Sequence, residues 1–196
     1  KHAQAWRGLG DEKTLAGDAD GADDAYAQHI EASVNDPKLL EAAVALRENK
    51  IPVAERILRD FLKLHPTDVT AMRMLAEIAA RLRRYDDAEK LLARALELAP
   101  GFTAARQNLA SIYYRHNKPE EALEHVQILL KEDGRNPAIR ALKAAILAQL
   151  GEYEQTSAIY EKLLRDVPVF PSAWMSYGHA LKTLGKTGEG IAAYRR

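Results

Sequence analysis

The stretch Ala71–Pro100, AMRMLAEIAARLRRYDDAEKLLARALELAP, decides the fold. Its first half places four apolar residues on one helical face: Leu75, Ile78, Ala79 and Leu82. Its second half does the same with Leu91, Leu92, Ala95 and Leu96. Between the two halves, Arg84–Asp87 reads as a tight turn whose acidic residues start the next helix, where they favour the helix dipole. The stretch therefore predicts a helix, a turn and a second helix that ends at Pro100.

The same ending recurs along the chain with a period of 34 residues, at Pro66, Pro100, Gly134 and Pro168. Two columns of small residues are in register with this period: Gly10, Ala42, Ala76, Ala110, Ala144 and Gly178, and then Ala22, Ala54, Ala88, Ala122, Thr156 and Gly190. A third column has larger side chains: Tyr26, Leu58, Leu92, Val126, Tyr160 and Tyr194. Small side chains allow close helix crossings, and the larger ones fill the space between neighbouring pairs. The columns predict a stack of helix pairs.

The period, the helix pairs and the small columns resemble tetratricopeptide repeats. The family's aromatic start and its glycine pair are present at Trp6 and Leu9–Gly10, and again at Trp174 and Tyr177–Gly178. The resemblance covers nearly the whole chain. It implies an all-α fold, a right-handed superhelical solenoid of about six helix-turn-helix units in a single array over residues 1–196. We expect units near 3–34, 35–68, 69–102, 103–136, 137–170 and 171–196, with the last one truncated.

The sequence departs from the family pattern at three places. Glu41 and Lys143 are polar where the family prefers a large apolar residue, and Lys13 is a further departure. The first two units also start 32 residues apart, which is shorter than the period elsewhere. These departures indicate altered local packing in the first, second and fifth units and a compressed first junction.

One stretch, ALKTLGKT at Ala180–Thr187, matches a permissive phosphate-loop pattern. A working phosphate loop follows a buried strand and presents free backbone N–H groups to the phosphates. The repeat instead places residues 180–184 in a helix and Gly185 in the turn, in register with Gly17 and Gly151. We therefore expect no nucleotide site and no cofactor.

Composition excludes several other functions. Lys plus Arg and Asp plus Glu both number 28, so no global field attracts nucleic acid or an anionic membrane. There is no cysteine, none of the six histidines forms a close His-x-x-x-His pair, and no Ser-His-Asp arrangement can be argued. No apolar run reaches the roughly 18 residues of a membrane-spanning helix. We predict no catalytic and no metal site, a chain that is not an enzyme, and a cytoplasmic location.

Partner binding is expected on the inner wall of the solenoid, which the first helices line according to the family resemblance. The inward-facing candidates are Arg73, Glu77, Arg81, Asn108, Ser111, Tyr114, Arg115, Met175, His179 and Lys182. Asn and Arg can hold main-chain amides and carboxylates, while Tyr and Met give apolar contact, so this set suits a peptide or a partner protein. The residues with which some family members hold the C-terminal carboxylate of chaperones are incomplete here, since Glu77, Ala138 and Leu142 replace three of them.

A narrower resemblance concerns three phrases, AWRGLGDEKTLAGDADGADDAYAQHI, NPAIRALKAAILAQLGEYEQ and WMSYGHALKTLGKTGEGIAAYRR. They are similar to the N-terminal repeats of bacterial proteins that have a sulfotransferase domain downstream, which implies the recruiting region of a larger sulfotransferase. We expect the chain to be part of a longer protein. Two functions stay open: a scaffold that binds a peptide or partner domain in a concave groove, and an oligomerisation or intramolecular docking module with no peptide ligand. The oligomeric state is open as well.

Overall fold

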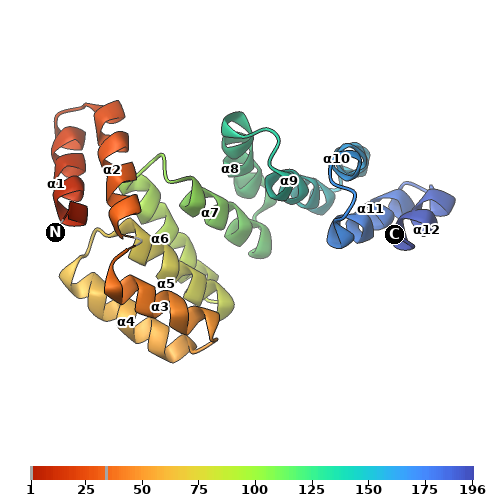
Figure 1. Ribbon diagram of the computed structural model, residues 1–196. Helices are drawn as coiled ribbons and strands as arrows, with labels where there is room; N and C mark the ends of the chain where they lie inside the picture. Colours follow the sequence, from red (N-terminus) through yellow and green to blue (C-terminus); the bar gives the residue numbers. More distant parts are fainter. Residues whose placement is uncertain (1, 34) are drawn as a thin grey trace. The chain divides into compact units, whose positions relative to one another are not determined.

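The computed structural model describes residues 2–33 and 35–196, and these residues form twelve α-helices and no strand (Figure 1). The helices are α1 (His2–Leu15), α2 (Ala19–Ser33), α3 (Pro37–Arg47), α4 (Ile51–Leu64), α5 (Val69–Arg81), α6 (Tyr85–Leu98), α7 (Thr103–Arg115), α8 (Pro119–Glu132), α9 (Pro137–Gln149), α10 (Tyr153–Asp166), α11 (Pro171–Thr183) and α12 (Thr187–Tyr194). Consecutive helices pack as pairs, as in α3–α4, α5–α6 and α9–α10, and α4 and α10 also pack on the helix that follows them. This architecture confirms the predicted all-α solenoid of helix pairs. Residues 1–112 and 113–196 form two compact units.

A left-handed residue follows the first helix in each of the six pairs. Glycine occupies this position at Gly17, Gly151 and Gly185, where φ is +75°, +83° and +78°. Asn49, Arg83 and Asn117 take the same position in the other pairs, with φ of 58° to 60°. The left-handed conformation ends a helix tightly, and glycine adopts it without steric cost.

The ALKTLGKT stretch forms one of these turns. α11 ends at Thr183, and the backbone N–H of Gly185 donates to the carbonyl oxygen of Lys182 at 3.0 Å. The N–H of Lys186 likewise donates to the carbonyl oxygen of Leu181 at 2.9 Å. These N–H groups are bonded within the chain, so they are not available to a phosphate. The prediction that this motif is a helix end and a turn is confirmed.

The small columns lie at the helix crossings, as predicted, and every residue of both columns is buried. In the first and last pairs, a tyrosine of the second helix packs against the small residue of the first helix, and that small residue is glycine. A β-carbon on Gly10 would lie 2.9 Å from the ring of Tyr26, and one on Gly178 would lie 2.6 Å from the ring of Tyr194. Both distances are too short for carbon atoms, so these crossings require glycine.

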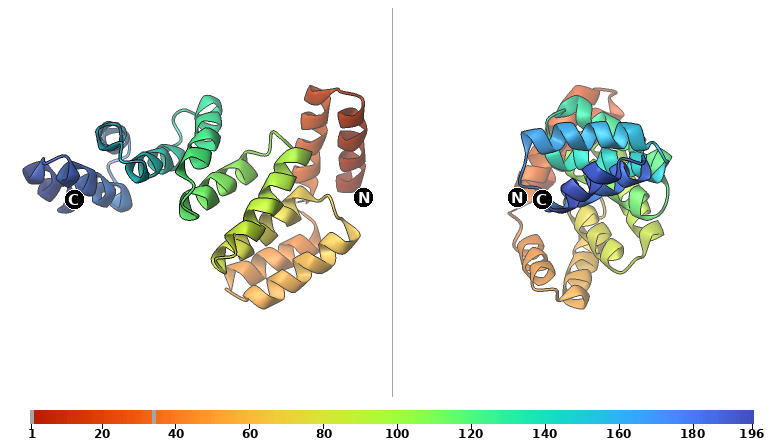
Figure 2. Two further views of the ribbon diagram at one scale, coloured as in Figure 1. Left: turned by 180° about the vertical axis from the view of Figure 1, so that it is seen from behind. Right: turned by 90° about the vertical axis from the view of Figure 1, so that its right-hand side faces the viewer.

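The first helix pair does not continue the stack. α4 packs on α5, and α2 also packs on α5, whereas the described residues of α2 do not pack along α3 in this way. Figures 1 and 2 show that α1 and α2 lie side by side and run in a different direction from α3 and α4. The 32-residue spacing of the first junction therefore accompanies a break in the stack within residues 1–112.

A buried polar cluster attaches this first pair. His29, Ser33 and Asp68 are 1%, 1% and 4% exposed. The Ser33 hydroxyl donates to the Asp68 carboxylate at 3.0 Å, and His29 Nε2 lies 3.5 Å from the same carboxylate oxygen. Asp68 also caps α5, because its other oxygen accepts from the backbone N–H of Ala71 at 2.8 Å. The α2 helix is thus bonded to the N-terminus of α5.

The face of α3 that would meet a preceding pair is exposed. On α5, the helix face that packs on α3 and α4 includes Met74, Leu75 and Ile78, which are all buried in one core cluster. The residues of α3 one repeat earlier are Leu40, Glu41 and Val44, and all three are exposed. Glu41 forms an ion pair with Lys38 at 2.9 Å. The polar residue at position 41, already a departure from the family pattern, therefore lies on a solvated face.

In the described part of the chain, none of the helices combines the length and the apolar character that a membrane span requires.

Candidate functional site

A groove of about 420 Å³ lies between α3 and α5. Its lining is Leu39, Leu40, Ala43, Leu46, Arg47, Thr70, Arg73, Met74, Glu77 and Arg81. Three of the predicted partner-binding residues, Arg73, Glu77 and Arg81, are among them. The apolar side chains of Leu39, Leu46 and Met74 are buried and form its floor.

Arg81 is held by two interactions at one end of this groove. Its Nη2 donates to Glu77 Oε1 at 2.6 Å, and its Nη1 donates to the carbonyl oxygen of Leu46 at 3.0 Å. Leu46 lies in the last turn of α3, and its carbonyl oxygen also accepts from the backbone N–H of Asn49 at 3.2 Å. Arg81 therefore ties α3 to α5, and its charge is balanced by Glu77.

Thr70 and Arg73 lie one helical turn apart on α5 and line the same groove. Thr70 is 4% exposed, and among the described residues its buried hydroxyl oxygen has no hydrogen-bond partner. Arg73 is half-buried, and within residues 2–33 and 35–196 its guanidinium makes no hydrogen bond or ion pair. A buried hydroxyl without a partner costs about 1–3 kcal/mol. The groove therefore presents a guanidinium without a partner next to a buried hydroxyl, within the described residues.

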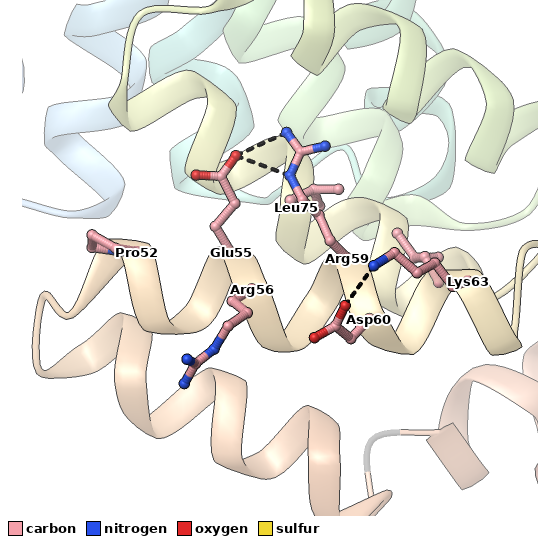
Figure 3. A pocket seen from close by; sticks show the side chains of 8 residues that line it. Pro52, Glu55, Arg56, Arg59, Asp60, Lys63 and Leu75 are labelled. Atoms are coloured by element: carbon pink, nitrogen blue, oxygen red, sulfur yellow. Dashed lines mark hydrogen bonds and ion pairs between the residues drawn. The ribbon is translucent and has the colours of Figure 1, made fainter.

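A larger hollow of about 700 Å³ lies along α4 and includes Leu75 of α5, and it is chemically different (Figure 3). Glu55 accepts hydrogen bonds from Arg84 at 2.8 Å and from Arg59 at 2.9 Å. These two guanidinium groups, Arg84 first, hold the pKa of Glu55 below its usual value. Asp60 is paired with Lys63 at 2.8 Å. Because these carboxylates are already paired with cations of the same surface, the α3–α5 groove is the better candidate site.

Three family models match this sequence, and each is described as a tetratricopeptide repeat. They match residues 39–101, 81–146 and 171–196. The chain belongs to the tetratricopeptide repeat family. The matched residues run from Leu39 in α3 through α8 and contain every residue that lines the α3–α5 groove.

Solved structures of other tetratricopeptide repeat proteins share this fold. A crystal structure of MamA has a TM-score of 0.69 and 19% identity, and the match covers 79% of this chain and 90% of that one. MamA from Desulfovibrio magneticus has a TM-score of 0.74 and 13% identity, covering 81% and 89%. YrrB, described as a TPR protein with an unusual peptide-binding site, has a TM-score of 0.66 and 14% identity, covering 84% and 88%. A search of curated protein sequences found no match. The resemblance to repeats of sulfotransferase proteins stays a prediction.

The other predicted partner-binding residues of this tetratricopeptide repeat chain lie on α7 and α11. Asn108, Ser111, Tyr114 and Arg115 belong to α7, and Met175, His179 and Lys182 belong to α11. The Ser111 hydroxyl donates to the carbonyl oxygen of Gln107 at 3.0 Å, within its own helix. The rings of His179 and Tyr194 meet edge to face, with centroids 5.3 Å apart. Met175 and Lys182 are exposed. That these residues bind a partner stays a prediction.

Sequence reasoning missed the α3 side of the groove and Thr70. The repeat itself contains the signal for α3, because Leu39, Ala43 and Arg47 stand one period before Arg73, Glu77 and Arg81. All three line the groove. No sequence signal indicates Thr70, because whether a helical threonine bonds to its own backbone depends on its rotamer.

Proposed function

We propose that this chain is a protein-interaction scaffold that binds an acidic, partly apolar peptide segment in the α3–α5 groove. The observation that carries the proposal is the buried Thr70 hydroxyl without a partner, one turn from the unpaired guanidinium of Arg73. A ligand carboxylate can accept from the guanidinium of Arg73, and from the buried hydroxyl of Thr70 if that side chain rotates toward the groove. Hydrogen bonds that involve a charged group are about twice as strong as neutral ones.

The charge of the groove favours an acidic ligand. Its cations are Arg47, Arg73 and Arg81, and its acidic residue is Glu77. Glu77 and Arg81 are paired, so among the described residues that line the groove, Arg47 and Arg73 are cations with no acidic partner in the groove. The half-exposed Leu40 and the buried floor provide contact for an apolar side chain beside the carboxylate. The peptide-binding site in the description of YrrB supports this use of the fold by analogy.

The test is a titration of a labelled peptide with alternating Glu and Leu, read by fluorescence anisotropy. Arg73→Ala and Thr70→Val should each weaken binding about tenfold, because each removes a hydrogen bond to a carboxylate. Thr70→Val should also raise the free energy of unfolding, since it keeps the shape of the side chain and removes the unsatisfied hydroxyl.

Arg56→Ala is the matched control for this titration. It removes one positive charge from the exposed surface of α4, outside the groove. Binding that falls equally with Arg56→Ala and Arg73→Ala would show attraction by charge alone and contradict the proposed site. Thr70→Val with unchanged affinity would contradict the role of the hydroxyl.

The predicted residues on α7 and α11 are an extension of this proposal. Asn108, Tyr114 and Arg115 combine an amide, an aromatic ring and a guanidinium on one helix. Their triple alanine variant should bind the partner more weakly while its helicity and melting temperature stay the same. In a larger protein, the groove would recruit a substrate to a sulfotransferase domain.

A docking module is the second candidate, and the uncovered face of α3 favours it. Val44 on this face is 42% exposed, whereas its counterpart Ile78 is fully buried in the stack. If this face joins two copies of the chain, sedimentation velocity should detect dimers in the wild type, and Val44→Lys should abolish them. A monomer at all concentrations, together with binding of the acidic peptide, would favour the scaffold.

A further inference from the structure

A third hollow lies beside the first helix pair, which leaves the stack. It has a volume of about 300 Å³ and lies between α2 and the connection from α6 to α7, which passes close to α2 (Figures 1 and 2). Its lining is Asp23, Tyr26, Ala27, Ile30, Glu31, Ala99, Gly101, Phe102, Thr103 and Ala104. It shares no residue with the α3–α5 groove. It is therefore a separate surface, beyond the proposed function of that groove.

The floor of this hollow is apolar. Tyr26, Ala99 and Phe102 are all buried. The hydroxyl of Tyr26 donates to the Asp11 carboxylate at 2.7 Å, so its polar end is already bonded away from the hollow. Ala27 and Ala104 have short, exposed side chains that leave the floor accessible. A volume of this size holds one or two large apolar side chains of a ligand.

Two carboxylates flank the floor. Asp23 and Glu31 are both exposed, and in the described residues neither side chain makes an ion pair or a hydrogen bond. The α2 helix contains no lysine or arginine, and none of the described residues that line the hollow is a cation. Eight residues of helix separate Asp23 from Glu31, which is about 12 Å along the axis at 1.5 Å per residue.

We propose that this hollow binds a basic segment of a partner protein, with an apolar side chain on the floor and a cation at each carboxylate. The distance of about 12 Å between Asp23 and Glu31 along α2 determines which positions of that segment carry the cations. In an extended peptide, residues four apart are separated by about 13 Å, and alternate side chains point to the same side. A cation, an apolar residue and a second cation at positions one, three and five therefore fit the two carboxylates and the floor.

The probe is a fluorescein-labelled peptide, Gly-Arg-Ser-Leu-Ser-Arg-Gly, titrated with the full chain and read by anisotropy at low ionic strength. The wild type should bind it saturably. Asp23→Asn with Glu31→Gln should weaken binding about fivefold, since two exposed ion pairs are lost. Ala27→Phe, which fills the hollow from an exposed position, should weaken binding as well. A peptide with Glu in place of both Arg residues should not bind.

Asp20→Asn with Asp24→Asn is the matched control, because it removes the same charge from the same helix outside the hollow. It should leave binding of the peptide unchanged. Arg73→Ala should also leave it unchanged, because Arg73 lines the α3–α5 groove and not this hollow. Circular dichroism checks that each variant is folded. The proposal is overturned if the wild type shows no saturable binding, if the control pair weakens binding equally, or if Ala27→Phe has no effect.

Discussion

At the scale of single residues, one left-handed position per pair shapes the turns. Glycine occupies three of the six positions and asparagine two, and both tolerate positive φ. Arg83 is the exception, with φ of 58°, and its side chain is exposed. In this backbone conformation the β-carbon of Arg83 lies too close to the following carbonyl oxygen. Within the described residues, the Arg83 side chain makes no hydrogen bond that would offset this cost.

Arg83→Gly should therefore stabilise the chain. The left-handed conformation costs an L-residue about 1–2 kcal/mol, and the extra freedom of glycine in the unfolded chain offsets about half of the gain. We expect an increase of about 0.5–1 kcal/mol in the free energy of unfolding, measured by urea denaturation. Arg83→Ala is the control, since it keeps the β-carbon and should not stabilise. Equal stabilisation by both variants would show that the arginine side chain, rather than the backbone, is unfavourable.

At the scale of helices, the small residues determine how closely a pair can approach. Ala88 on α6 and Ala122 on α8 are completely buried, and each belongs to the second small column. The larger residues one turn later, Leu92 and Val126, are also buried. A crossing of this kind has no room for a longer side chain, because protein interiors are close-packed.

Ala88→Leu and Ala122→Leu should each destabilise the chain by about 1–3 kcal/mol through overpacking. Thermal melting followed by circular dichroism measures this loss. Ala158→Leu is the matched control, because Ala158 is exposed on α10 and the same change meets no neighbour there. Melting temperatures unaffected by both core variants would mean that these two alanines do not lie at crossings.

At the scale of the whole molecule, the attachment of the first pair is a polar joint within residues 1–112. The stacked pairs are held by apolar clusters, such as the one that contains Leu58, Phe61 and Met74. The first pair is also attached by polar contacts: those of His29 and Ser33 with Asp68, and a hydrogen bond of 2.6 Å between Gln4 and His65. Buried polar groups are favourable only when all of them are satisfied, so the joint should be sensitive to a single change.

Asp68→Ala and Asp36→Ala form a matched test of this joint. Both aspartates cap the first helix of a pair, α5 and α3, but within the described residues the side chain of Asp36 makes no hydrogen bond or ion pair with α2. Loss of a cap costs about 1 kcal/mol. Asp68→Ala also removes the acceptor of the buried Ser33 hydroxyl, while His29 keeps its contact with the carbonyl oxygen of Ala3 at 2.9 Å, so we expect a total of about 2–3 kcal/mol.

Urea denaturation measures both variants, and hydrogen exchange reports on α1 and α2. Amide protection in these two helices should fall with Asp68→Ala and stay unchanged with Asp36→Ala. An equal loss of stability in the two variants would show that the joint contributes nothing beyond the cap.

The sequence by itself determined the repeat. The 34-residue period and the small columns predicted helix pairs whose first helices begin at Val69, Thr103, Pro137 and Pro171, as the structure has them. They also identified ALKTLGKT as a helix end and a turn. These features depend on residues close in sequence, and because one local pattern is repeated, they can be predicted from the sequence. The same register placed Arg73, Glu77 and Arg81 on one face of a helix.

Only the tertiary structure decided where the first pair lies and what its position creates. The short spacing and Glu41 indicated an altered junction, but they did not indicate that α2 would bond to Asp68 across a gap of 35 residues. The pairing of Glu77 with Arg81 and the unsatisfied hydroxyl of Thr70 likewise depend on side-chain rotamers within a packed groove. The packing of one repeat on the next follows from the sequence pattern that all repeats share. A contact that does not repeat depends instead on which side chains, distant in sequence, come together in the fold. The physical reason is that burial and hydrogen bonding are decided jointly by all the groups that surround a side chain.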